Sequence, residues 1–389
     1  MFEIIKWVFA VITTILGIIG GIAAIDYFCS GCVKKFNLIA YFRWQKRGCK
    51  LEPISEPSGT VPLNSPFYVE RPPIESACYE NIGFSDALIR VKAPRQMGKS
   101  SLLVRILDQS KLQSRRIVYL SFQEADNEIF SSLDRFLYWF CGSVTEQLGL
   151  PDKLDKNWQG VLGSKSKCNN YFEKYLLNEI AKPLVLGLDE VDMIFEHEAI
   201  AADFFSLLRV WHEKGKNEEP WKRLRMVITH SQEVYVPLDM KQSPFNVGIA
   251  VDLPEFTQEQ VQDLARRYKQ ALTDEQIEQL VKLVGGHPYL LQVALYQIAH
   301  KRYTLKKLLK VAPYEDGPYS EHLRRHRLNL EKHVELANEA KRVMSADNPL
   351  PASEVNEIFR LRSMGLVKVK DDEVMPLCDL YRQYFNKRL

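Results

Sequence analysis

The run APRQMGKSS, from Ala93 to Ser101, restricts the fold of this chain more than any other feature, because it follows an apolar segment and opens a helical one. It matches the phosphate-binding pattern GxxxxGK[ST] except at the first glycine, where Ala93 stands. In such a P-loop, backbone N–H groups and the helix N-terminus face the phosphates, the Lys99 ammonium contacts the β and γ phosphates, and the Ser100 hydroxyl ligates Mg²⁺. The run predicts a site for ATP or ADP with Mg²⁺; the alternative is a chance GKS on a basic turn. The predicted nucleotide-binding residues here are Ala93, Pro94, Arg95, Gln96, Met97, Gly98, Lys99, Ser100 and Ser101.

A second element is the apolar run PLVLGLDE, which ends in Asp189 and Glu190. In a doubly wound sheet, ligands bind beyond the carboxyl ends of the strands. Asp189 is therefore predicted to hold Mg²⁺ through water, and Glu190 to orient or deprotonate the attacking water, with Lys99 as the second catalytic residue. Hydrolysis is the implied reaction. The alternative is that the acids only begin the next helix as favourable first-turn charges, a role that suits Asp192 better.

The segment RLRMVITH is predicted to be a further strand, and polar residues follow it: Thr229, His230 and Ser231. Nucleotide hydrolases often place a residue that senses the γ-phosphate at such a strand end, so Ser231 joins the predicted nucleotide contacts. No arginine stands in this run. Hydrolysis is then expected to be slow or to need an arginine from a neighbouring protomer. The alternative is that His230 and Ser231 only end the strand and start a loop.

Short apolar runs alternate with longer helical ones over the middle of the chain. The predicted strands are 87–93, 115–122, 183–190 and 223–230, and the predicted helices begin at Lys99 or cover 128–148, 169–181 and 198–213. This alternation favours an α/β fold with a parallel sheet and helices on both faces. From 257 to 309 the pattern is helical only. In the tail, Leu366 to Leu377 predicts a small hairpin with Asp371 and Asp372 in its turn.

The N-terminal segment predicts one transmembrane helix. No residue from Trp7 to Ile25 is charged, and such a run is long enough to cross a hydrocarbon core of about 30 Å. Basic residues between Lys34 and Lys50 outnumber those before the span, which predicts a single-pass protein of the inner membrane with its C-terminal part in the cytoplasm. A cleaved signal peptide and a buried core helix are the alternatives. The proline-rich residues 51–66 are predicted to be an extended linker.

Composition narrows the class of protein. With 46% apolar residues the chain is expected to fold, and 52 basic against 49 acidic residues leave a net charge of +3, without the basic excess expected of a protein that grips nucleic acid along a face. The seven scattered cysteines favour a reducing compartment. Cys29 and Cys32 form one C-x-x-C without a second pair, so free or lipidated thiols are favoured over a zinc site.

Several motifs together resemble a known family, the bacterial AAA-like ATPase domain close to the STAND class of signal-transducing P-loop NTPases. They are FYVERPPIE (67–75), IRVKAPRQMGKSSLL (89–103), LVLGLDEVD (184–192), SPFNVG (243–248), LVGGHPYL (283–290), MGLVKV (364–369) and LYRQYF (380–385).

The resemblance covers about residues 66–389 and carries its own expectations. It implies that the stretch from Tyr68 to Arg71 packs near the adenine. It also implies that Gly285 to Pro288 of a helical lid closes over the nucleotide, with His287 and Pro288 as predicted nucleotide contacts. It also implies a C-terminal winged helix. The expected domains are a transmembrane and juxtamembrane segment (1–50), the linker (51–66), the P-loop NTPase core (67–255), the lid (256–312) and the winged helix (313–389).

Three functions remain open at this point. The first is a membrane-anchored ATP-hydrolysing switch that acts with an unidentified protein partner, with a homo-oligomer left open. The second is an ATPase that handles DNA through its winged helix, for which His322, Arg324, Arg325, His326 and Arg327 would supply a basic face. Binding of nucleic acid is disfavoured but left open. The third is a nucleotide-binding scaffold without hydrolysis, against which the presence of Glu190 argues.

Overall fold

The computed structural model describes residues 55–231, 244–352 and 356–389. The predicted transmembrane and juxtamembrane segment (1–50), with Cys29 and Cys32, lies outside these ranges, as do linker residues 51–54. Within the described ranges, no helix is both long and apolar enough to cross a membrane. The predicted span over Trp7 to Ile25 therefore stays a prediction.

Five parallel strands form the central sheet, in the order β2-β3-β4-β1-β5. They are β1 (Leu88–Lys92), β2 (Arg116–Ser121), β3 (Leu184–Asp189), β4 (Leu224–His230) and β5 (Ile249–Asp252). The four predicted strands and the predicted parallel α/β fold are confirmed, whereas β5 was not predicted. Because β4 lies between β1 and β3, the end of β4 separates the P-loop from the acidic end of β3.

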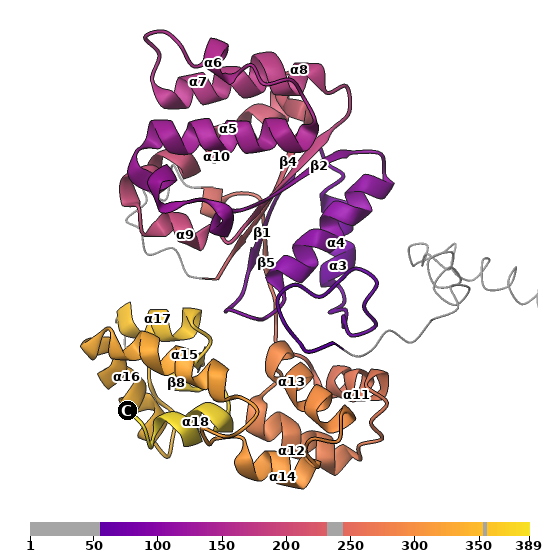
Figure 1. The fold of residues 1–389 in the computed structure, drawn as a ribbon, viewed down its shortest axis with the longest axis vertical. Helices are drawn as coiled ribbons and strands as arrows, with labels where there is room; N and C mark the ends of the chain where they lie inside the picture. Colours follow the sequence, from indigo (N-terminus) through magenta and orange to yellow (C-terminus); the bar gives the residue numbers. More distant parts are fainter. Residues whose placement is uncertain (1–54, 232–243, 353–355) are drawn as a thin grey trace, which may run out of the picture. The chain divides into compact units, whose positions relative to one another are not determined.

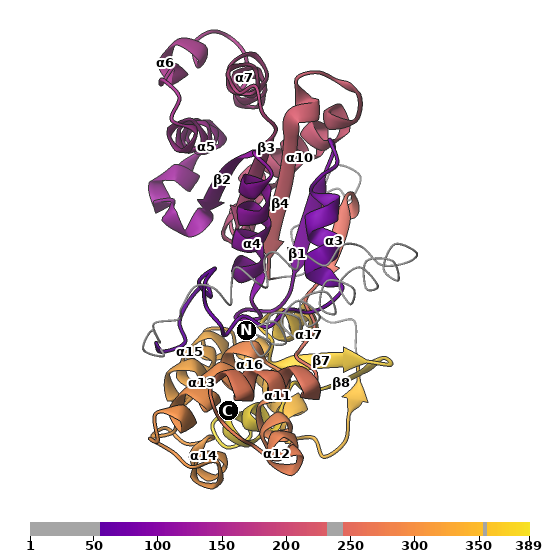
Figure 2. The ribbon, with the colours of Figure 1, turned by 90° about the vertical axis from the view of Figure 1, so that its right-hand side faces the viewer.

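Helices cover both faces of the sheet (Figures 1 and 2). They are α3 (Ile74–Asn81), α4 (Lys99–Leu112), α5 (Leu133–Leu148), α6 (Leu154–Asn157), α7 (Ser164–Tyr171), α8 (Leu177–Glu179), α9 (Asp192–Phe195) and α10 (Glu198–Asn217). Short 3-10 turns lie at η1 (Phe122–Glu124), η2 (Asn127–Ser131), η4 (Trp221–Arg223) and η5 (Pro244–Asn246), and one π turn lies at η3 (Phe172–Leu176).

The side chains of β3 alternate between two buried cores, as the period of two in a strand requires. Leu186 and Leu188 belong to the core under α5, α7 and α10, and Val185 belongs to the core under α3 and α4. Gly187 lies on the same face as Val185, and a Cβ there would lie 3.0 Å from the side chains of Leu103 and Leu107 on α4. The missing side chain thus lets α4 pack directly on β3. The same alternation directs Asp189 to the face that carries α4.

The remaining chain forms two smaller helical parts. The predicted helical stretch 257–309 contains α11 (Gln258–Arg267), α12 (Asp274–Val284), α13 (Pro288–Ala299) and α14 (Leu305–Val311). It is followed by α15 (Ser320–Glu331), α16 (Val334–Ser345), β6 (Leu350–Pro351), α17 (Asn356–Ser363), β7 (Val367–Lys370), β8 (Glu373–Pro376) and α18 (Asp379–Phe385). The predicted hairpin is confirmed: β7 and β8 are antiparallel, and Asp371 and Asp372 form its turn with φ of 52° and 59°. The winged-helix assignment and the domain boundaries stay predictions.

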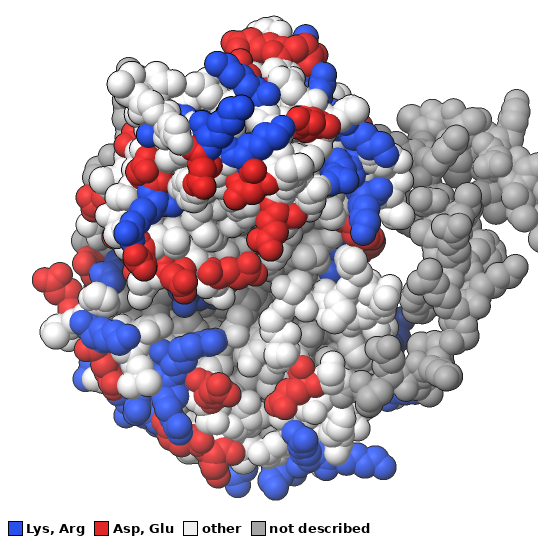
Figure 3. Space-filling view, turned by 45° about the horizontal axis from the view of Figure 1, so that its top comes forward, with Lys and Arg blue, Asp and Glu red and all other residues white. Residues whose placement is uncertain are grey.

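The basic face that DNA binding would need is not formed by the five residues named for it. His322 and His326 are buried. Arg324 and Arg327 form ion pairs with Glu315. The prediction is therefore wrong for the two histidines, which α15 turns into the protein, whereas Arg324 and Arg325 are exposed and binding of nucleic acid is not tested. Positive and negative side chains are also interspersed over the face displayed in Figure 3.

Candidate nucleotide site

The P-loop connects β1 to α4 through residues 93–98. Gln96 and Gly98 adopt left-handed backbone conformations, with φ of 62° and 97°, and Gly98 is the N-cap of α4. This turn folds the loop back over the first residue of the helix. The ammonium of Lys99 donates to the backbone oxygens of Ala93 and Pro94, each at 2.8 Å. The cation is therefore held inside the loop at the place predicted for phosphates.

Burial and nearby carboxylates act in opposite directions on the pKa of Lys99. Burial lowers the pKa of Lys99 to about 8, and Arg95 acts in the same direction. Three carboxylates oppose this shift by attraction, those of Asp192, Asp189 and Glu190. The structure thus brings together the predicted lysine of the P-loop and the predicted acids of β3, although they are far apart in the sequence.

Asp189 is almost fully buried, at 2% exposure, and donors hold both of its carboxylate oxygens. The Tyr119 hydroxyl donates to Oδ2 at 2.7 Å, and the Thr229 hydroxyl donates to Oδ1. Tyr119 lies on β2 and Thr229 on β4, the two neighbours of β3 in the sheet. The pKa of the Tyr119 phenol is raised by burial and by the adjacent Asp189 charge. These two bonds fix the direction of the Asp189 carboxylate.

Glu190 stands in a strained position just beyond β3. Its φ is 56°, a left-handed conformation that is uncommon for a residue with a side chain. Its backbone N–H donates to the Thr229 hydroxyl oxygen at 3.1 Å, and the Ser121 hydroxyl donates to its Oε2 at 3.4 Å. Burial, followed by repulsion from Asp189, raises the pKa of Glu190. A half-buried carboxylate with a raised pKa is suited to accept a proton from water.

The residues after β4 form a second layer behind the two acids. The backbone N–H of Ser231 donates to both oxygens of Asp192 at 2.8 Å, and its hydroxyl donates to Oδ2 at 2.7 Å. Asp192 lies in the first turn of α9. His230 is buried, and its backbone oxygen accepts from the N–H of Ala93 at 3.4 Å. Ser231 thus lies beside the site, joined to an acid, and its contact with a phosphate stays a prediction.

Arg71 and Tyr68 approach the loop from the segment before α3. The Arg71 guanidinium donates to the backbone oxygen of Met97 at 2.8 Å and is nearly fully buried, at 3% exposure. The Tyr68 hydroxyl donates to Glu75 at 2.8 Å, and its ring lies 3.5 Å from the Arg105 guanidinium carbon. Arg71 braces the P-loop from within the protein, and Tyr68 packs beside α4. Their predicted place near the adenine is not tested.

The predicted lid residues His287 and Pro288 lie at the start of α13, with Pro288 as its first residue. His287 is buried, and burial lowers its pKa to about 4, although a hydrogen bond with the Arg95 backbone opposes the shift. Gly286, just before His287, packs against the start of the lid, because a Cβ there would lie 2.3 Å from the backbone oxygen of Phe256. The lid therefore touches the P-loop through a neutral histidine.

The part of the chain after the lid also lies against the P-loop. A Cβ on Gly365, between α17 and β7, would lie 2.9 Å from the Cβ of Pro94. Burial, followed by the charges of Arg325, His287 and Arg95, lowers the pKa of His326 on α15 to about 3. The P-loop is thus in contact with the sheet core, the lid and the C-terminal part at once.

The oxygen donors present fit a magnesium ion, which prefers oxygen ligands. Within the described residues, the Ser100 hydroxyl makes no hydrogen bond, so it is available at the first turn of α4. Asp189 keeps unused lone pairs, since each carboxylate oxygen accepts more than one bond. No group of three or more His, Cys, Asp or Glu among the described residues could hold a metal ion by itself. The donor set therefore requires phosphate oxygens and water to complete it.

The sequence alone did not single out Tyr119 and Ser121, which contact the two acids. Both lie near the carboxyl end of β2, in the run RRIVYLSF. A polar residue at a strand end is a usable signal in a parallel sheet. It could not be used here without knowing that β2 is the neighbour of β3.

Comparisons with known proteins identify the family and the fold of the chain. A family model described as an AAA-like domain matches residues 56–387. An uncharacterized WD repeat-containing protein of Synechocystis sp. is 29% identical over 215 residues, which are 51% of this chain but only 17% of that protein. Among solved structures, the Walker-type ATPase of Pyrococcus abyssi is similar with a TM-score of 0.56 and 12% identity, over 82% of this chain and 96% of that one. The ORC2 protein of Aeropyrum pernix has a TM-score of 0.49 and 15% identity, over 81% and 89%. The fold is that of an AAA-like P-loop ATPase.

Proposed function

Since the chain belongs to the AAA-like domain family, whose model spans residues 56–387, we propose that it binds ATP with Mg²⁺ and hydrolyses it as a molecular switch. The observation that carries the proposal is the convergence of Lys99, Asp189 and Glu190 at one edge of the sheet, where the carboxylates attract the Lys99 charge. A lysine at a helix N-terminus beside one buried and one half-buried acid is the arrangement that phosphoryl transfer to water needs.

In this mechanism, nucleotide binding redirects Lys99. In the structure, the Lys99 ammonium donates to the backbone oxygens of Ala93 and Pro94. In the proposed nucleotide complex, the β and γ phosphates replace these oxygens as stronger, charged acceptors. Ser100 and Asp189 would hold the Mg²⁺, which neutralises the charge that develops on the phosphates. Asp189 is already oriented by Tyr119 and Thr229, so little reorganisation is needed.

Glu190 accepts the proton of the attacking water. Its raised pKa makes it a better proton acceptor than an exposed carboxylate, and the Ser121 hydroxyl and the Thr229 hydroxyl hold it in place. No arginine is proposed at the end of β4, so turnover is expected to be slow unless a neighbouring copy supplies one.

The switch is proposed to act through the lid and the C-terminal part. His287 and Gly365 both lie against the P-loop, at Arg95 and Pro94 respectively. A phosphate that moves this loop changes both contacts, which is how ligand state can bias two conformations. We include in the proposal a membrane anchor over Trp7 to Ile25, a STAND-like signalling role and a winged helix within 313–389. The uncharged run, the family resemblance and the β7–β8 hairpin support these three parts.

The proposal is tested by nucleotide binding to the full-length chain and two matched variants. Lys99→Ala is expected to weaken ATP–Mg²⁺ binding by about a hundredfold, because one charge-assisted contact to phosphate is lost in a buried setting. Lys111→Ala, at the exposed end of the same helix, is expected to bind as the wild type does. If calorimetry gives the same ATP–Mg²⁺ affinity for the wild type and both variants, the P-loop assignment is wrong.

A further inference from the structure

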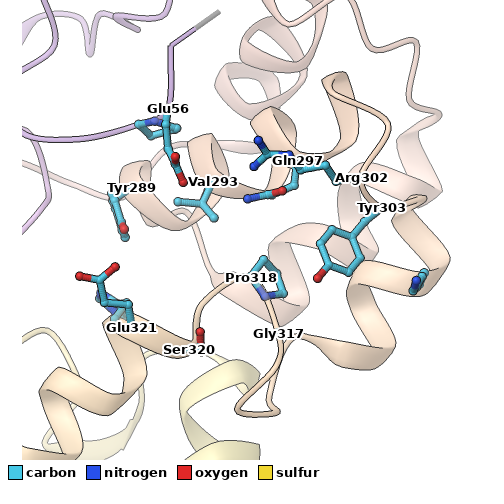
Figure 4. A pocket seen from close by; sticks show the side chains of 13 residues that line it. Glu56, Tyr289, Val293, Gln297, Arg302, Tyr303, Gly317, Pro318, Ser320 and Glu321 are labelled. Atoms are coloured by element: carbon cyan, nitrogen blue, oxygen red, sulfur yellow. The ribbon is translucent and has the colours of Figure 1, made fainter.

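A pocket of about 480 Å³ lies away from the P-loop, among α13, α14, the start of α15 and the N-terminal residues Glu56 and Pro57 (Figure 4). This volume is in the range of small-molecule sites. Gly317 helps to shape it, because a Cβ there would lie 2.3 Å from the Val311 backbone oxygen. None of the nucleotide-site residues named above lines this pocket.

The pocket contains a buried hydrogen-bond acceptor without a partner. The side chain of Gln297, on α13, is only 8% exposed and lines the pocket, and its Oε1 has no hydrogen-bond partner among the described residues. His322, on the opposite helix α15, is 3% exposed and also has an unpartnered ring nitrogen, Nδ1. This Gln297 oxygen is also shielded from solvent, so a ligand N–H reaches it once the Gln297 side chain rotates toward the pocket, and the hydrogen bond that burial leaves unmade is then formed.

Acidic side chains lie at one end of the pocket rim and basic side chains at the other. Glu56 and Glu321 lie on one side, and Arg302 with Tyr303 on the other (Figure 4). Lys307 belongs to the second end, because its ammonium lies 5.5 Å from the centre of the Tyr303 ring. None of these four charged side chains forms an ion pair within the part of the chain that the structure describes.

We propose that this pocket binds a short peptide with unmodified ends, which carries an ammonium group at one end and a carboxylate at the other. Its ammonium group pairs with Glu56 and Glu321, and its carboxylate pairs with Arg302 and Lys307. An amide or ammonium N–H donates to Gln297. Exposed ion pairs contribute little individually, so specificity comes from matching both ends while satisfying the buried amide. A ligand with one sign of charge would leave the opposite end of the rim unpaired.

The same site is coupled to the P-loop by α13, a part of the inference that rests on the proposed function. The N-cap of α13, His287, contacts Arg95, and its later turns present Tyr289, Val293 and Gln297 to the pocket. His322 continues this link, because its ring centre lies 6.2 Å from that of His287. A ligand that shifts α13 therefore changes the P-loop contact, and nucleotide must change ligand affinity by the same factor.

The test uses the full-length chain and the set of unmodified dipeptides as probes, with binding measured by calorimetry. At least one dipeptide is expected to bind, and its N-acetylated and C-amidated forms are each expected to bind about tenfold more weakly, as the loss of one charged contact predicts. Gln297→Leu and Lys307→Gln are expected to weaken binding at least as much. Lys306→Gln is the matched control, since Lys306 is exposed on the same helix but does not line the pocket.

The proposal is overturned if no dipeptide binds, or if Lys307→Gln and Lys306→Gln behave alike. Peptide binding must also persist in Lys99→Ala, which separates this site from the nucleotide site. If a peptide binds without changing ATP affinity, the coupling to the P-loop is refuted, but the peptide site itself is still supported. A chain that binds peptide but no ATP overturns the proposed function instead.

Discussion

The hydroxyl of Tyr119 donates a 2.7 Å hydrogen bond to Oδ2 of Asp189, from the strand beside it. The two side chains lie on the same face of the sheet, because Tyr119 pairs in register with Gly187, two residues before Asp189. Gly187 has no side chain, so α4 packs closely against β3 at this position. The phenol therefore orients a buried carboxylate, which makes Tyr119 a positioning residue in the proposed reaction.

Tyr119→Phe is expected to raise the Mg²⁺ concentration needed for half-maximal ATP turnover by about 10- to 100-fold, since one hydrogen bond to a charged group contributes roughly 1.5–3 kcal/mol. The melting temperature is expected to change little by comparison. Tyr138→Phe is the control, because Tyr138 also donates to a carboxylate, that of Asp155, at 2.8 Å. An unchanged Mg²⁺ dependence in Tyr119→Phe would show that this bond is only structural.

Glu190→Gln is expected to keep ATP affinity while turnover falls by about 10²–10⁴-fold, because the amide keeps the shape but cannot accept the proton of water. Asp189→Asn is expected to weaken both binding and turnover. Glu196→Gln, at an exposed position after α9, serves as the control. If Glu190→Gln and the wild type hydrolyse ATP equally fast, Glu190 is not the catalytic carboxylate. If the wild type binds ATP without hydrolysis, the scaffold hypothesis replaces the switch.

ATP affinity is expected to fall as the pH rises from 7 to 9. Burial lowers the pKa of Lys99 to about 8, so in the free protein the lysine loses its proton across this range. Phosphate favours the protonated form and raises the pKa, so binding above pH 8 must take up a proton. Calorimetry in buffers of different ionisation enthalpy measures this uptake. A proton count of zero at pH 9 would contradict the proposed role of Lys99.

Stability is expected to fall between pH 7 and pH 5 because of the buried histidines. Burial lowers the pKa of His287 to about 4 and that of His326 to about 3, from an ordinary value of 6.5. The unfolded chain therefore binds protons first as the pH drops below 6.5, and each buried histidine then costs up to about 1.4 kcal/mol per pH unit. Denaturant unfolding of His326→Phe is expected to show a smaller pH slope, and exposed His333→Gln an unchanged one.

The full-length chain is expected to remain in membranes after carbonate washing, with its C-terminus reachable by protease only after the cells are opened. The uncharged run from Trp7 to Ile25 and the basic residues that follow it motivate both expectations. Deletion of residues 1–50 is the matched control and is expected to release the protein. Release of the intact chain by carbonate would refute the anchor.

Local patterns were sufficient for much of the fold. The apolar run before Ala93 and the GKSS that follows predicted β1, the P-loop and the start of α4, because each depends on neighbours in sequence. The strand β5 was not predicted from the sequence, because it is only four residues long and its side chains are mostly exposed. The basic face on α15 was predicted wrongly in its two histidines, because residue types alone do not say which side of a helix is buried.

The sequence by itself determined which residues carry the chemistry: Lys99 and Ser100 at a helix start, and Asp189 and Glu190 at a strand end. Periodicity and turn chemistry act over a few residues, so they can be read along the chain. The tertiary structure decided what surrounds these groups. The strand order put Tyr119 and Thr229 on either side of Asp189, and chain folding brought His287 and Gly365 to the P-loop. These contacts depend on which strands pair and how the helices pack, and burial then sets the pKa of Lys99 and of the histidines.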